Sequence, residues 1–172
     1  MSRCTPLVLV ALVSGCGAFD FEIERPIDEV RVEGDPDLSG LRVPAAEDLI
    51  PPQVWEADLP QEPAGIFLER MELTITNGGR DDGDDDFAFV DSVVFYASPT
   101  APGTELERHP LAWISREHEG IDGQTLSLTP NRALNLVPYI VEGFEVTSTL
   151  VARVPPSDLT LEGTATLSVD LL

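Results

Sequence analysis

An acidic run between two predicted strands is the candidate for metal chemistry in this sequence. The run reads Arg80-Asp81-Asp82-Gly83-Asp84-Asp85-Asp86. Calcium takes about six to eight oxygen ligands, which carboxylates supply well. The candidate calcium ligands are Asp81, Asp82, Asp84, Asp85 and Asp86. Because their order does not fit an EF-hand loop, a solvated hairpin turn after Asn77-Gly78-Gly79 is the alternative.

The two histidines have glutamate neighbours but no spacing that predicts a zinc site. His109 follows Glu107 closely, and His118 stands between Glu117 and Glu119. Zinc needs three or four converging ligands, whereas successive side chains of an extended segment point in opposite directions. We therefore expect both histidines to lie on the surface.

A different kind of chemistry is indicated near the N-terminus, at Cys16. Arg3 gives a positive start, residues 6–13 are mostly apolar, and the small residues Ser14 and Gly15 precede the cysteine. A secretory signal has this order of charge, apolar core and small residues before its cleavage site. The apolar stretch is shorter than the roughly 20 residues of a membrane-spanning helix. The alternatives are a secretory signal without lipidation and a buried N-terminal segment.

The run Leu12-Val13-Ser14-Gly15-Cys16 resembles the lipobox of bacterial lipoproteins, with Val13 where that family most often has leucine. The resemblance implies that residues 1–15 are a signal peptide that is removed. It also implies that Cys16 carries two or three acyl chains, enough for stable anchoring where one chain binds only reversibly. The implied location is the bacterial cell envelope. Gly17, in place of aspartate, favours the outer membrane over the inner membrane.

Nucleophilic catalysis has no matching motif in the sequence. Cys4 lies within the predicted signal peptide, so Cys16 would be the one cysteine of the mature chain, and it would be acylated. Ser115 precedes Arg116, and the sequence contains no Gly-x-Ser-x-Gly elbow. We therefore expect no enzyme, no disulfide, and no cofactor besides the acyl chains and the candidate calcium ion.

The charge of the chain restricts its partners. It has 31 acidic and 10 basic residues, a formal net charge of -21, and every basic residue is arginine. Nucleic-acid binding requires a basic surface that displaces counterions, so that class is excluded. Such high net charge favours a soluble monomer. The expected partners are the membrane, through the lipid anchor, and another envelope protein.

The chain after the predicted signal peptide divides into three regions of one domain. Residues 16–34 contain the lipidated N-terminus and one or two predicted strands, with a turn at Glu24-Arg25-Pro26. Residues 35–64 are predicted to form a proline-rich irregular crossover, with a flexible spacer as the alternative. Within it, 37–41 and 45–50 could form short helical pieces, and Trp55 is expected to dock on the main domain. Residues 65–172 form the main β body.

The main body is predicted as strands separated by turn residues. The expected strands are 67–75, 87–96, 111–115, 125–128, 144–154 and 159–171, with one short helix in 132–141. Phe67 is expected inward together with Met71. The strand 87–96 is apolar apart from Asp91 and its neighbour, which predicts cover on both faces. In the last strand, Gly163 indicates a bulge or bend.

This pattern predicts an all-β fold, an antiparallel β-sandwich that is immunoglobulin-like in outline. Residues 87–172, including the block Asn135-Leu136-Val137-Pro138-Tyr139-Ile140, are similar to uncharacterised bacterial lipoproteins with a β-sandwich body. That resemblance implies no catalytic residues. A binding surface is also possible because large aromatic side chains favour interfaces. The aromatic candidates are Trp55, Tyr96, Trp113, Tyr139 and Phe144.

Two functions are compatible with these features. The first is a membrane-anchored envelope lipoprotein that presents a non-enzymatic β-sandwich for protein interaction or a structural role. The second is an envelope lipoprotein that binds calcium through the aspartate-rich turn or a small ligand in an apolar groove.

Overall fold

The computed structural model describes residues 19–43, 46–47, 50–55, 63–76, 86–117, 121 and 123–171. In these residues the protein is nearly all-β, as the alternating sequence pattern predicts. The strands form one antiparallel sheet that curls until it is nearly barrel-shaped.

The described sheet has nine strands, and two short helices accompany it. The strands are β1 (Phe19–Val32), β2 (Ala46–Glu47), β3 (Gln53–Val54), β4 (Gly65–Ile75), β5 (Val90–Pro99), β6 (His109–Ser115), β7 (Thr125–Pro130), β8 (Phe144–Ala152) and β9 (Leu159–Leu171). The helices are the 3-10 helix η1 (Phe87–Phe89) and the predicted short helix, α1 (Val137–Glu142). The strand order is β1-β9-β4-β7-β6-β5-β8-β2, and β3 also pairs with β8.

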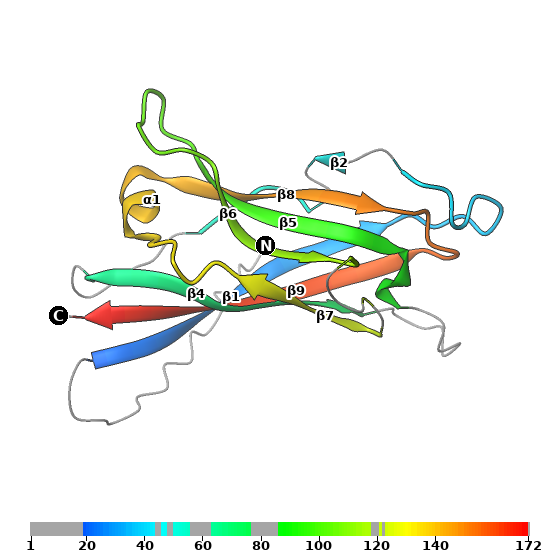
Figure 1. Cartoon of the computed structure of the whole chain (residues 1–172), viewed down its shortest axis with the longest axis horizontal. Helices are drawn as coiled ribbons and strands as arrows, with labels where there is room; N and C mark the ends of the chain where they lie inside the picture. The colour runs from blue at the N-terminus through cyan, green and yellow to red at the C-terminus, as the bar shows by residue number, and fades with distance from the viewer. Residues whose placement is uncertain are drawn as a thin grey trace, which may run out of the picture.

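The core fills the space between the two halves of the curled sheet. Figure 1 shows β1, β4 and β9 in the lower half, β5 and β8 in the upper half, and α1 at one end. The halves are joined where β6 pairs with β7, with Ala112 opposite Pro130. The regular alternation of β9 buries one face of that strand, as predicted. Its buried residues are Leu159, Leu161, Ala165, Leu167 and Val169.

β1 is one continuous strand, which is one of the two predicted alternatives, but the turn predicted at Pro26 does not occur. The strand pairs with β9 from Phe19 opposite Leu171 onward and has one bulge after Ile27. The turn prediction is wrong because β1 lies at the end of the strand order. An edge strand tolerates proline, since half of its backbone groups point away from the sheet.

A bulge also overturns the predicted orientation of Phe67. β4 pairs with β9, and its register shifts between Leu68 and Arg70. Met71 is fully buried as predicted, but Leu68 takes the inward position before the bulge, and Phe67 is half-exposed. One extra residue in a strand reverses the alternation on either side of it.

β5 is central, as predicted, but it is covered on one face only. It lies between β6 and β8, and its register with β8 shifts between Val90 and Ser92, so Asp91 lies in a bulge. From Val93 onward, buried residues alternate with partly exposed ones. Val94 belongs to the partly exposed set, so the outer face of the strand is not covered by a second layer of the described chain.

The proline-rich segment runs along β8 as a broken edge strand. Arg42 bridges to Arg153, and β2 and β3 pair with β8 farther along. Residues 36–40 form turns and β2 is a strand, so the predicted helical pieces are wrong where the structure describes them. Prolines interrupt the ladder because they lack the N–H donor. Trp55 is buried against the domain, which confirms its predicted docking.

Gly163 allows close packing of β9 with both neighbouring strands. It pairs with Ile27 on one side and Leu73 on the other, and the predicted bulge is in β1, opposite Gly163, rather than in β9. A Cβ atom at this position would lie 2.7 Å from the carbonyl oxygen of Glu72. Glycine is therefore required here by space.

Candidate functional site

One predicted calcium ligand is visible, and it has a structural partner. Asp86 Oδ1 accepts a hydrogen bond of 2.8 Å from the backbone N–H of Ala88 and caps η1. The other candidates, Asp81, Asp82, Asp84 and Asp85, lie outside the described residues. Among the residues that the structure describes, no group of three or more histidine, cysteine, aspartate or glutamate residues is placed to hold a metal ion.

Of the remaining predicted residues, His109 lies on the surface, as expected, with its ring centroid 6.5 Å from that of Tyr139. The second histidine, His118, lies outside the described residues, as does Cys16. Within the described chain, no helix is long and apolar enough to cross a membrane.

A cluster that the sequence did not predict surrounds Asp91, and we call it the arginine cluster. Three arginines lie within ion-pair distance of this carboxylate. Arg153 Nη2 is 3.3 Å from Oδ1, Arg116 Nε is 3.7 Å from Oδ1, and Arg42 Nε is 3.4 Å from Oδ2. Three guanidinium groups facing one carboxylate leave a local excess of positive charge in a strongly acidic protein.

The sheet positions each member of the arginine cluster. The bulge in β5 holds Asp91 beside the end of β8, where the N–H of Arg153 donates to the carbonyl of Phe89 at 2.7 Å. The side chain of Arg116 donates to the carbonyl oxygens of Ala88 and Val90, so this guanidinium is fixed to the backbone. Arg42 enters the cluster through the broken edge strand.

Burial distinguishes the roles within the cluster. The side chain of Asp91 is 13% exposed, whereas those of Arg42 and Arg153 are 75% and 42% exposed. Within the described part of the chain, Asp91 Oδ2 accepts no hydrogen bond. Arg42 and Arg153 lie opposite each other on paired strands, an arrangement that repels like charges. Asp91 offsets only part of this repulsion.

The outer face of β5, β6 and β8 continues from the cluster with aromatic side chains. Trp113 is 39% exposed on this face, and the guanidinium carbon of Arg108 lies 3.9 Å from the ring centre of Tyr96. Arg108 also donates to Thr147 Oγ1 at 3.2 Å. The other aromatic candidates, Trp55, Tyr139 and Phe144, are buried in the core.

The outer face of the opposite half is acidic by comparison. Its strands β1, β4 and β9 carry exposed or half-exposed carboxylates: Glu22, Glu24, Glu69, Glu72, Glu162 and Asp170. The same strands also carry the exposed Arg31 and Arg70, so carboxylates outnumber arginines on this half without excluding them.

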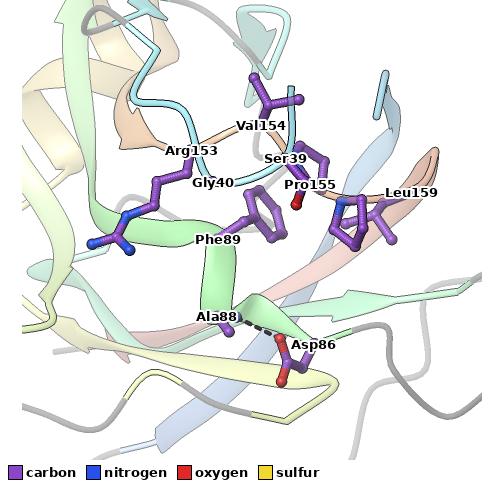
Figure 2. A pocket seen from close by; sticks show the side chains of 10 residues that line it. Ser39, Gly40, Asp86, Ala88, Phe89, Arg153, Val154, Pro155 and Leu159 are labelled. Atoms are coloured by element: carbon purple, nitrogen blue, oxygen red, sulfur yellow. Dashed lines mark hydrogen bonds between the residues drawn. The ribbon is translucent and has the colours of Figure 1, made fainter. Parts of the chain in front are cut away.

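Two adjoining cavities lie beside the cluster, around Phe89. Their volumes are about 250 and 300 Å³, and both are lined by Phe89, Arg153 and Val154. Figure 2 shows the first cavity, with the ring of Phe89 in its wall and the guanidinium of Arg153 directed away from it. Val32 of β1 and Leu150 of β8 line the second, so it lies between the two edges of the curled sheet.

Compared with known proteins, the chain matches no family model and no curated sequence. The arginine cluster and the cavities around Phe89 therefore supply the functional argument.

Proposed function

We propose that this protein is a lipid-anchored lipoprotein of the bacterial cell envelope, with the outer membrane favoured over the inner. The lipobox-like run ending at Cys16 supports the anchor, and only Gly17 and Ala18 separate Cys16 from Phe19, the first residue of β1. A spacer this short would hold the β body close to the lipid surface. The body itself is proposed to be a β-sandwich, immunoglobulin-like in outline, because its two halves face each other across one core.

The proposed role of the body is non-enzymatic protein binding. The observation that carries this proposal is the outer face of β5, β6 and β8, which combines the arginine cluster with Trp113 and Tyr96. Arginine, tryptophan and tyrosine are the residue types most enriched at binding hot spots.

The anchor is tested by Cys16→Ser. We expect loss of fatty-acid labelling and release of the protein from the membrane fraction. Membrane association that persists without an acyl label would contradict the anchor.

The binding face is tested by placing a photo-crosslinking amino acid at Trp113 in intact cells. Thr164, exposed on the opposite half of the sheet, is the matched control position. We expect a discrete adduct from position 113 and none from 164. Equal labelling from both positions, or none from either, would reject this face.

A small-ligand function is a second proposal, and the cavities around Phe89 favour it. Ligand pockets span roughly 300–1,000 Å³ and are mostly apolar, so the cavity of about 300 Å³ is at the lower limit and that of about 250 Å³ is just below it. Calorimetry with short fatty acids tests this site, with Phe89→Trp expected to abolish the heat of binding.

Calcium binding by the aspartate run is the other ligand-binding proposal. A calcium titration that gives no heat and no rise in melting temperature would reject it.

A further inference from the structure

We infer that Arg42 and Arg153 bind a carboxylate group of an acidic polypeptide partner. This inference rests on the proposed protein-binding role and names the chemistry of the partner. The recognising atoms are the exposed guanidinium groups of the arginine cluster, beside the aromatic side chains of the same face.

The cluster is electrostatically incomplete by itself. Asp91 supplies one negative charge to three guanidinium groups, and Arg116 is already fixed by backbone carbonyls. Arg42 and Arg153 face each other across the ladder, and Arg42 is three-quarters exposed. A second carboxylate between them would relieve their repulsion and use donors that now face water.

A carboxylate suits this position because one is already bound there. Arg153 Nη2 donates a hydrogen bond of 3.3 Å to Asp91 Oδ1, whereas Arg42 Nε lies 3.4 Å from Oδ2 without a hydrogen bond, so a second carboxylate could accept from Arg42. A forked guanidinium binds a carboxylate through two parallel hydrogen bonds. A long polyanion, such as a nucleic acid or an anionic membrane, would also meet the repulsion of a chain with net charge -21. A short acidic segment meets mainly the local positive charge, because salt screens charges beyond about 8 Å.

The aromatic side chains of this face offer contact area to the residues of the partner segment that flank its carboxylate. Val94 of β5 pairs with Trp113 of β6, so the two lie side by side on the outer face. Tyr96 follows on β5 and is covered on one side by Arg108. An acidic segment with apolar or aromatic residues among its carboxylates would therefore fit this face better than a purely acidic one.

The test uses the full chain, purified from the membrane fraction in detergent micelles, so that the protein keeps any anchor it carries. The probe is a fluorescein-labelled ten-residue peptide of alternating glutamate and tyrosine, and fluorescence anisotropy gives its Kd. We expect the double variant Arg42→Met, Arg153→Met to bind roughly tenfold more weakly, about the effect of one lost charge-assisted contact. Arg132→Met is the matched control, because this arginine pairs with Glu69 and is similarly exposed.

Three outcomes would overturn the inference. One is equal affinity of the double and control variants for the peptide. Another is tighter binding of a ten-unit polyphosphate than of the peptide, which would assign the arginines to phosphate. The third is self-association: if the wild-type and control proteins sediment faster at higher concentration and the double variant does not, the partner is a second copy of this chain.

Arg42→Met alone keeps the test valid if the double variant fails to fold, since Arg42 is largely exposed. A specific crosslink from position 113 that survives the loss of both arginines would retain the proposed function while rejecting this inference.

Discussion

The indole ring of Trp55 meets the ring of Phe144 edge-on, with centroids 6.4 Å apart and planes inclined by 79°. Trp55 follows β3 in the proline-rich segment, whereas Phe144 begins β8 and is fully buried. Tyr139 of α1 contacts the same phenyl ring in a similar T-shaped arrangement, at 5.9 Å. Three separate segments are therefore joined through one aromatic group at the end of the core.

Trp55→Ala should lower the free energy of unfolding by about 3–5 kcal/mol, the usual effect of removing a large buried aromatic side chain. Urea denaturation followed by circular dichroism measures this change. The matched control is the neighbouring Val54→Ala, since Val54 is 65% exposed and should change stability little. Equal effects of the two substitutions would contradict the anchoring role of Trp55.

Gly163→Ala should destabilise the sheet by about 1–3 kcal/mol, because the added methyl group overpacks the space between β4 and β1. Thermal unfolding measures the loss. The neighbouring residue Thr164 is exposed, so Thr164→Ala is the control for a change within the same strand. An unchanged melting temperature for Gly163→Ala would show that the strands can separate to accept a Cβ atom.

The phenol of Tyr139 should ionise at higher pH than a free tyrosine. Burial is the main cause that raises its pKa above the ordinary 10.0, and the negative charge of Glu107 raises the pKa further. Because the folded protein keeps this proton longer than the unfolded chain, its contribution is complete below about pH 10 and is lost as the pH rises through the folded pKa. Absorbance at alkaline pH measures the ionisation.

Tyr139→Phe is the control for that measurement. It should remove the late-titrating phenol and the 2.7 Å hydrogen bond from Tyr139 Oη to the carbonyl of Glu107, at a cost of about 0.5–1.5 kcal/mol. A late phenol titration that persists unchanged in Tyr139→Phe would refute the prediction.

The pKa of Asp158 should be lower than that of a free aspartate. The hydrogen bond from Arg31, at 2.6 Å, is the main cause that lowers it from the ordinary 3.8, and the N–H of Gly34 contributes a second bond at 3.0 Å. A lowered pKa stabilises the fold above the unfolded pKa, and this effect disappears as the pH falls below about 3.8 through the folded pKa. Carbon NMR of the carboxyl group follows the titration.

Arg31→Met should move the pKa of Asp158 back toward 3.8. The stability effect is expected to be small, because both side chains are exposed to solvent. Arg70→Met, which removes an ion pair on β4, should leave the Asp158 titration unchanged.

Much of the sheet could be predicted from local patterns. The alternation in β9 identifies its buried face because nothing interrupts its period of two, and Gly163 adds no extra residue there. Predictions failed at positions such as Phe67 and Pro26, where pairing partners decide the outcome. The bulge after Leu68 reverses the inward face, and the edge position of β1 admits a proline.

The arginine cluster could not be predicted, because its members come from four segments far apart in sequence. Arg42, Asp91, Arg116 and Arg153 meet only through the order of the strands. No short motif marks such a group. The clustering of arginines in a chain with few basic residues is visible only in three dimensions.

The pairing of β1 with β9 has a consequence for the timing of folding. The first described strand has its partner in the last, with Phe19 opposite Leu171, and β9 also supplies the partner of β4. A ribosome releases the chain from its N-terminus, so β1 must wait unpaired until β9 emerges, whereas β4 can already pair with β7. Contacts between such distant segments also slow folding, because a long loop must close before they form. In newly made chains β1 should therefore stay accessible to chaperones and proteases until residues 159–171 have emerged.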